Sequence, residues 1–546
     1  MARGCLARAL SSRAVDDRSA DMPGSSDAGS RAANLAKALR KPWAPAVVLA
    51  VLALAAFASG LGGGFVLDDA YAIVGHPAVQ GTAPLLDAFR LSFWGEALSS
   101  TPPSYRPLAT LSFAVDQRLF GGSAVAFHAS SLLCYLALVL VAWIFARRLM
   151  SAWAAGLAGA FFAVMPTHAE NVSSLVGRAD TLAVLFSVLA LLALSPTIVN
   201  GQATPVRRVS LAMLAFAAGL LCKETIAVLP VIVGLFAEYR RRAAGAPSSR
   251  LRLHAPTAAL FAVLMAYVAL RLKIQPSALS YTAPTDVLAG AGLWQKAAYG
   301  VELLARYARL VVAPVDLCTG RTFAEVSRPT GVSGILLVGG GLLALAGYAS
   351  WTGYRRGGFP FVAAALLAWL LVTGVLFPIP ESMADRFLIW PSLFLCLAVG
   401  PWLVAAWRRG IWARALLLGA LGVQIVLSSV QAATWSDEGH LLAHAVRACP
   451  DSIHNHFRYA EYLSQRGDVD EAVWHYGVFT SGRHAFPYAW SHPAAKEEVT
   501  VPVEQRLRRM HGLLRFGLDE ATWRARFAAY LRSFGRKREA HRIEGL

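Results

Sequence analysis

The sequence has little charge for its length. Of its 546 residues only 15% are Asp, Glu, Lys or Arg, and 56% are hydrophobic. Soluble domains carry roughly a quarter charged residues. The chain also lacks a glycine-rich dinucleotide fingerprint and a phosphate-binding loop with its lysine. The composition therefore excludes an ordinary soluble protein, and no segment predicts a nucleotide-binding domain.

Cysteine is scarce as well. The six cysteines are widely separated and include no CxxC pair. Neither a zinc site nor a dithiol redox motif is therefore predicted. The presence of one disulfide is left open, because Cys318 and Cys449 could both lie outside the membrane and pair.

Basic residues are the charge that is present in excess, and the formal net charge is +18. The arginines occur as short clusters between apolar runs, which is the pattern of cytoplasmic loops in membrane proteins. No surface that interleaves aromatic and basic residues is recognisable. We therefore expect membrane lipids, and no nucleic acid, among the partners.

The apolar residues gather in long runs, and a helix of roughly 20 such residues spans a bilayer. We predict an all-α polytopic membrane protein with about eleven transmembrane helices. Arginine clusters follow every second helix, which places the N-terminus in the cytoplasm and the C-terminus outside. We interpret Leu293 to Pro314 as an interfacial amphipathic helix, because Glu302, Arg306 and Arg309 share one helical face. The predicted spans are 44–60, 125–146, 150–166, 181–197, 206–222, 225–239, 255–272, 333–353, 359–377, 387–406 and 411–430.

Three regions follow from this pattern. Residues 1–43 are rich in Arg, Ser, Ala, Asp and Gly and are predicted to form a disordered cytoplasmic tail. The first apolar run lies too deep for an ordinary cleaved signal peptide, so we interpret it as a retained signal anchor. Residues 44–430 form the transmembrane domain, in which 61–124 is the first outer loop. Residues 431–546 form an extracytoplasmic helical domain.

The outer loops collect acidic and basic residues at the expected water boundary. Asp68 and Asp69 stand side by side in FVLDDAYAIV. A carboxylate can take the proton from an acceptor hydroxyl that attacks an activated sugar, and nearby cations can hold the phosphate of a lipid-linked donor. Two neighbouring carboxylates also tend to differ in pKa. The other polar residues of these loops are Arg106, His168, Glu170, Arg178, Asp180, Lys223, Glu224, Asp385 and Arg386.

Each of these residues alone has a simpler explanation as a solvated flank, a helix cap or a packing residue. Their convergence on one face of the membrane favours a site. The acids and His168 show no metal-ligand spacing. We therefore expect no required cofactor, and a divalent metal is left open.

Several motifs occur in one family's order between residues 65 and 392. They are FVLDDAYAIV, SFWG, SYRPLATLSF, AFHASSLL, PTHAENVSSLVGRADTLAVLF, LLCKETIAVL and ESMADRFLIWPS. On these motifs the chain resembles the transmembrane and tetratricopeptide-repeat (TMTC-type) O-mannosyltransferases, which belong to the GT-C class of polyprenyl-phosphate-sugar-dependent glycosyltransferases.

The resemblance implies a GT-C-type helical bundle with Asp68 as the catalytic base and Asp69 beside it. It also implies that the nine polar residues of the outer loops line the site, and their chemistry favours Arg106, Arg178 and Arg386 as phosphate contacts. The sequence departs from the family at IVGHP, where relatives often have Asn at Gly75 or His76. It departs again at Asp385, where the family usually has Glu, whose side chain is longer by one methylene.

The C-terminal region carries helical-hairpin signals. Ala460, Gly467, Ala472 and Tyr476 have the spacing of a tetratricopeptide repeat, and Ala528, Gly535 and Ala540 repeat part of it after the irregular stretch 481–502. Fewer than three repeats do not usually form a stable solenoid. The domain is either a small cap on the outer face or a module that docks the acceptor, and its basic tail could also touch anionic headgroups.

The leading hypothesis is an extracytoplasmic-facing glycosyltransferase, in the inner membrane if the source is bacterial. It would move a sugar, with mannose favoured, from a polyprenyl phosphate to Ser or Thr of a translocated protein. An envelope glycan or lipid acceptor is the alternative. A transporter or flippase would need ionisable residues at mid-membrane depth, and a scaffold would need a longer repeat array.

Overall fold

The computed structural model describes residues 43–99, 103–243, 250–276, 292–321, 332–355, 360–376, 383–450 and 452–468, and isolated residues beyond 468. The predicted tail, apart from Trp43, and the stretch 481–502 lie outside the described residues. Within these ranges the backbone is helical or irregular, and extended pairing is limited to two isolated bridges.

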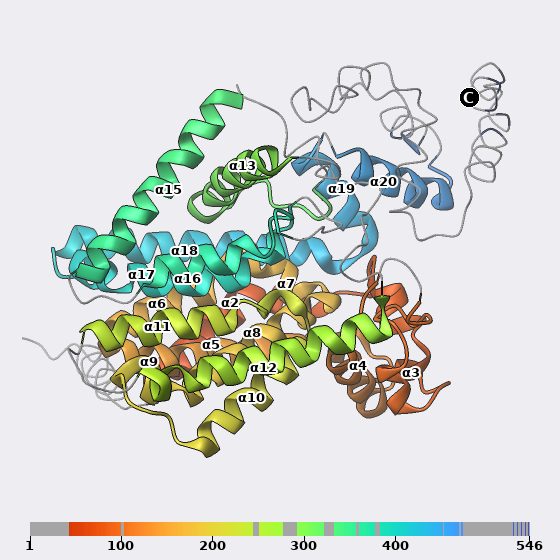
Figure 1. The fold of residues 1–546 in the computed structure, drawn as a ribbon. Coiled ribbons are helices and arrows are strands. Elements are labelled where there is room, and N and C mark those ends of the chain that lie inside the picture. The colour runs from red at the N-terminus through yellow and green to blue at the C-terminus, as the bar shows by residue number, and fades with distance from the viewer. Residues whose placement is uncertain are drawn as a thin grey trace, which may run out of the picture. The chain divides into compact units, whose positions relative to one another are not determined.

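Residues from Leu49 onward form one compact unit. The helices of ten or more residues, shown in Figure 1, are α2 (Ala44–Phe57), α4 (Pro107–Phe120), α5 (Ala124–Leu149), α6 (Ala152–Ala163), α8 (Arg178–Ala193), α10 (Val206–Leu220), α11 (Leu229–Ala243), α12 (Arg250–Ile274), α13 (Leu293–Val312), α15 (Val332–Arg355), α16 (Phe361–Leu370), α17 (Ile389–Trp407), α18 (Ile411–Ala433), α19 (Glu438–Ala448) and α20 (Ile453–Arg466).

Six helical segments of the described chain are long and apolar enough to cross a membrane: Ala44–Gly62, Ala124–Leu149, Leu175–Ala193, Leu251–Ile274, Asp385–Trp407 and Ile411–Ser436. The all-α, multi-pass class predicted from the sequence is therefore confirmed. Helices also occupy the other five predicted spans, but α6, α10, α11, α15 and α16 fall short of the same length or apolarity among the described residues. The number of eleven crossings and the orientation of the termini stay predictions.

Small residues bring the apolar helices close together. α6 packs against α17, and a Cβ added to Gly400 of α17 would lie 3.0 Å from the carbonyl oxygen of Ala154 and 3.2 Å from the Cβ of Ala158. Such close backbone approach is typical of membrane helix pairs. α8 packs against both α5 and α10, so the second outer loop, which leads into α8, is held by two neighbouring helices.

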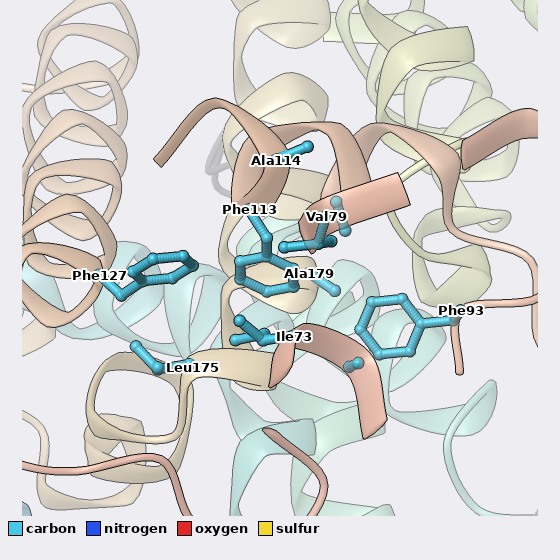
Figure 2. Close-up of a cluster of buried hydrophobic side chains, with 10 residues drawn as sticks. Ile73, Val79, Phe93, Phe113, Ala114, Phe127, Leu175 and Ala179 are labelled. Atoms are coloured by element: carbon cyan, nitrogen blue, oxygen red, sulfur yellow. The ribbon is translucent and has the colours of Figure 1, made fainter. Parts of the chain in front are cut away.

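The first outer loop is anchored by a cluster of apolar side chains (Figure 2). α4 begins at Pro107, where the missing N–H is not needed, and it ends before Gly121 in the left-handed conformation. Burial of a large apolar side chain contributes about 1.5–3 kcal/mol, so several buried rings hold the loop firmly against the helices. The cluster comprises Ala72, Ile73, Val79 and Phe93 of the loop, Ala109, Phe113 and Ala114 of α4, Phe127 of α5, Leu175 just before α8 and Ala179 in the first turn of α8.

The amphipathic helix predicted from Leu293 to Pro314 is α13, which packs against α15. Its apolar face contributes Tyr299, Leu303 and Tyr307 to a second buried cluster that includes Leu388. The Tyr307 hydroxyl accepts from the Ala384 N–H and donates to the Ala384 carbonyl, at 3.1 and 3.2 Å. α13 therefore fixes the backbone of the segment that carries Asp385.

The two C-terminal helices begin and end at residues that favour helix termini. Asp437 caps α19 by accepting from the His440 N–H, and Ser452 caps α20 by accepting from the Asn455 N–H. α20 ends before Gly467, whose φ of +83° is left-handed. Ala460 is buried as the predicted repeat requires. The tetratricopeptide assignment stays a prediction, because Tyr476, Gly535 and Ala540 lie outside the described residues.

A disulfide joins Cys318 to Cys449, which confirms the pairing left open by the sequence. Cys318 belongs to the segment 317–321, which follows α13, and Cys449 directly follows α19. Two further contacts run in parallel, from the Ser452 hydroxyl to the Gly320 carbonyl at 2.9 Å and from the Asn455 amide to the Thr319 carbonyl at 3.0 Å. The segment 317–321 therefore ties the α19–α20 pair to the part of the chain beside Asp385.

Candidate active site

Asp68 and Asp69 are adjacent in sequence but lie in opposite environments. The Asp69 side chain is buried, and its carboxylate accepts from the Val66 N–H at 3.1 Å and the Val176 N–H at 3.2 Å. Burial raises the pKa of Asp69 to about 7, against the two backbone donors, which lower it. The Asp68 side chain is 44% exposed. Asp69 therefore joins two outer loops, and Asp68 is the carboxylate that solvent can reach.

The backbone around this pair is unusual on both sides. Leu67 has φ +50°, the left-handed region that non-glycine residues rarely occupy. One turn of π-helix, Ala70–Val74, follows Asp69. Strained dihedrals and π-turns persist where the surrounding structure holds them, and they concentrate at functional sites. The local geometry aims two consecutive carboxylates in different directions.

Arg178 is the most enclosed cation of the site, with 1% of the residue exposed. Its Nη1 donates to Asp116 Oδ2 at 2.5 Å, its Nε to the Ser131 hydroxyl at 2.9 Å and its Nη2 to the Phe127 carbonyl at 2.7 Å. The guanidinium also lies 4.7 Å from the centre of the Phe113 ring. Each of its three nitrogens thus has a protein acceptor, and Arg178 joins α8 to α4 and α5.

Gly177, the residue before Arg178, explains why this motif needs glycine. A Cβ at this position would collide with the Glu170 carbonyl oxygen and approach the Asn171 Cα to 2.9 Å. Only glycine lets the backbone pass this closely. The second outer loop is therefore folded tightly on itself between Glu170 and Arg178.

Asp180 and Lys223 form a buried ion pair, with 2.5 Å between Lys223 Nζ and Asp180 Oδ2. The Leu108 N–H donates to the Leu221 carbonyl at 3.2 Å, which brings the start of α4 to the same turn. The first, second and third outer loops meet at this point.

Arg106 and Arg271 lie near Glu224. Desolvation raises the pKa of the Glu224 carboxyl, but the charges of Arg106 and then Arg271, together with a backbone hydrogen bond and another nearby cation, lower it on balance. Arg106 Nε and Arg271 Nη1 are buried and have no hydrogen-bond partner within the part of the chain that the structure describes. Buried donors are normally satisfied, so this pair of guanidinium groups is suited to an external anion.

Glu170 and Asp385 hold the last outer loop. The Glu170 carboxylate accepts from the Arg386 side chain and, at 2.9 Å, from the Arg386 N–H. Asp385 accepts from Arg321 Nε at 3.2 Å and from the Cys318 N–H at 3.1 Å. These contacts connect the second and last outer loops to the segment 317–321.

His168 lies fully inside the helical core. Its Nδ1 is 2.8 Å from the Tyr135 hydroxyl and its Nε2 is 2.9 Å from the Ser392 hydroxyl. Both ring nitrogens are engaged, so His168 links α5 to α17 at the level of the second outer loop. The described residues contain no group of three or more His, Cys, Asp or Glu suited to a metal ion.

The structure adds site residues that sequence reasoning missed. Asp116 is the single acid of an otherwise apolar face of α4, and Arg271 stands at the predicted outer end of a span, against the positive-inside rule. Both signals were present in the sequence. No sequence signal pointed to Arg321 or Arg458, because each reaches the site from a distant segment through tertiary contacts.

The comparisons with known proteins agree with the motifs. The family model described as dolichyl-phosphate-mannose-protein mannosyltransferase matches residues 101–270. Similar curated proteins include the protein O-mannosyl-transferase Tmtc2 of Drosophila melanogaster, 36% identical over 37% of this chain and 22% of that protein. The protein O-mannosyl-transferase TMTC4 of Homo sapiens is 37% identical over 33% of this chain and 27% of that protein. The family resemblance is confirmed for this part of the chain.

The chain spans only about a quarter of the length of these O-mannosyl-transferases. The matched residues 101–270 contain Arg106, Arg178 and Lys223, whereas Asp68 and Asp69 precede them. Among solved structures, ArnT from Cupriavidus metallidurans bound to undecaprenyl phosphate is 14% identical, with a TM-score of 0.39, over 88% of this chain and 82% of that chain.

Proposed function

We propose that this chain is a membrane glycosyltransferase of the GT-C class that transfers mannose from a polyprenyl phosphate to a hydroxyl of a translocated protein. The reaction takes place on the extracytoplasmic face, and Ser or Thr is the acceptor. The proposal is supported by the O-mannosyl-transferase names of the similar proteins and by the chemistry of the outer loops.

The observation that carries the proposal is the division between the paired acids. Asp69 is buried and bound to two backbone N–H groups, so it holds the loop in place. Asp68 presents a reachable carboxylate on that fixed loop. A positioned carboxylate of this kind can accept the proton of the acceptor hydroxyl while the hydroxyl oxygen bonds to the anomeric carbon and the donor phosphate leaves.

The donor phosphate is assigned to Arg106 and Arg271. Their buried, unpartnered nitrogens can form charge-assisted hydrogen bonds to phosphate oxygens, and the lipid tail of the donor would remain in the bilayer. Arg178 serves as a positioning residue, because its nitrogens already donate to protein acceptors. The other basic residues of the site are Arg386 and Lys223. Each forms an ion pair with an acid of the second outer loop, Arg386 with Glu170 and Lys223 with Asp180.

The test is sugar transfer by the purified chain in lipid, with radiolabelled polyprenyl-phosphate mannose and extracytoplasmic proteins of the same cells. We expect Asp68→Asn to lower the rate by about 10²–10⁴-fold, the range for loss of a general base. Asp87→Asn is the matched control, because Asp87 lies in the same outer loop and pairs with the exposed Arg90.

Equal transfer by wild type and Asp68→Asn would refute the assignment of the base. Transfer to glycans or lipids instead of proteins would refute the protein acceptor but keep the enzyme class. If the wild type transfers no sugar from any polyprenyl phosphate to any of these acceptors, the proposed function is wrong.

A further inference from the structure

Helix α20 of the C-terminal region reaches the proposed catalytic acid. Arg458 Nη2 lies 4.0 Å from Asp68 Oδ1, and the two side chains are 20% and 44% exposed. The Arg458 Nε is buried and has no hydrogen-bond partner among the residues that the structure describes. The guanidinium is therefore largely enclosed, with its outer edge turned to the carboxylate of Asp68.

A second, apolar contact joins the same two regions. Leu441 of α19 and Trp435 pack on Val66, and the partly buried Leu67 lies against this cluster. The Gly64 N–H also donates to the Ser436 carbonyl at 2.8 Å. The residues directly before Asp68 are therefore held by the chain that leads into α19.

The far end of the helix pair is fixed independently. The disulfide Cys318–Cys449 and the bond from Ser452 to Gly320 attach the start of α20 to the segment 317–321. Arg458 lies on the second turn of α20, so its backbone is placed by these attachments and not by its own side chain. The position of its guanidinium over Asp68 follows from the packing of the whole helix pair.

We infer that Arg458 is a positioning residue for Asp68, and that α19 and α20 form a wall of the active site in addition to any cap or docking role. This inference rests on the proposed function. The cation holds the Asp68 carboxylate in one orientation, so that its free oxygen faces the acceptor hydroxyl. Preorganisation of this kind affects turnover more than substrate binding.

A competing explanation is that Arg458 serves only the packing of α19 and α20. Glu438, at the start of α19, is exposed at the surface; desolvation raises the pKa of its carboxyl, and the charge of the nearby Arg458 opposes this shift. If Glu438 is the functional partner, the reactivity of Asp68 will not depend on Arg458. The experiment therefore measures the chemical reactivity of the Asp68 carboxylate directly, in addition to the rate of catalysis.

The test uses the full chain in lipid with Arg458→Gln, Arg458→Lys and the control Arg466→Gln. Arg466 lies exposed in the last turn of the same helix and contacts Tyr462. The first measurement is the rate at which a water-soluble carbodiimide modifies Asp68, followed by peptide mass spectrometry. The second is the kinetics of mannose transfer.

We expect carbodiimide to modify Asp68 about threefold faster or more in Arg458→Gln, because a neighbouring cation no longer covers and attracts the carboxylate. The value of kcat should fall about 10- to 100-fold with little change in donor KM, and Arg458→Lys should recover part of it. Arg466→Gln should match wild type in both measurements.

Unchanged labelling and unchanged kcat in Arg458→Gln would overturn the inference. If Arg458→Gln does not fold, Arg458→Lys decides by the same two measurements, since it changes the geometry and keeps the charge. If the wild type shows no transfer, the labelling rate still decides: faster labelling supports the positioning of Asp68 while the proposed function fails, and equal labelling overturns both.

Discussion

Arg178 and Asp116 form a salt bridge of 2.5 Å whose side chains are 0% and 6% exposed. The pair joins the start of α8 to α4, so it ties the second outer loop to the first. Removing one partner of a buried pair leaves the other charge without compensation, which costs far more than loss of a surface pair.

The first prediction concerns this pair. Asp116→Ala should lower the stability of the protein by about 3–5 kcal/mol, because Arg178 is left buried and charged. Asp87→Ala is the control, since the Arg90–Asp87 pair has an exposed arginine and should cost less than about 1 kcal/mol. Thermal unfolding in detergent measures both, and equal losses would show that the Arg178–Asp116 pair is not a structural element.

The second prediction follows from the raised pKa of Asp69. Its carboxyl titrates at about 7 in the folded chain and has an ordinary value of 3.8, so between these values the folded state keeps a proton that the unfolded state has lost. Stability contributed by this group is therefore present below about pH 4, falls as the pH rises to about 7, and is constant above, with a total change on the order of 1–4 kcal/mol.

Asp69→Asn removes this titration. The difference in melting temperature, variant minus wild type, should increase from pH 4 to pH 7 and then level off. Parallel melting curves for the two proteins across this range would contradict the burial of an ionisable group at this position.

The third prediction concerns the disulfide. Cys318 and Cys449 are separated by 131 residues, and a cross-link that closes a long loop contributes roughly 2–4 kcal/mol. Replacing both by Ser should lower the melting temperature and open the α19–α20 pair to limited proteolysis. Cys134→Ala serves as the control, because Cys134 is a free cysteine in α5. Protease resistance equal to wild type would mean that packing alone holds the helices.

The fourth prediction addresses the donor site. Arg271→Gln should weaken binding of polyprenyl phosphate by about 10- to 100-fold, because a hydrogen bond to a charged group contributes roughly 1.5–3 kcal/mol. Binding is measured by fluorescence quenching with the short-chain lipid phosphate. Arg447→Gln, on the exposed side of α19, should bind as wild type does. Equal affinity of Arg271→Gln and wild type would remove Arg271 from the donor site.

Part of the site was predictable because its signals are local. The acidic pair, the loop arginines and Gly177 stand in short motifs at the ends of apolar runs, and alternation of arginine clusters indicates which runs share a side. The burial of these groups was not predictable in the same way. His168 and Arg178 are polar residues of a type and position that suggest a solvated loop. Both are nevertheless buried by helices that come from distant parts of the chain.

The sequence by itself determined the class of the protein: long apolar runs must form helices in a bilayer, where every backbone group needs an internal partner. It also determined which polar residues stand together at span ends. Only the tertiary structure decided their roles, because burial and pairing depend on contacts between segments far apart in sequence. In the folded chain Asp69 is buried while the side chain of Asp68 is exposed, and Arg178 forms an ion pair with Asp116. Folding also places Arg458 of the C-terminal helix 4.0 Å from Asp68.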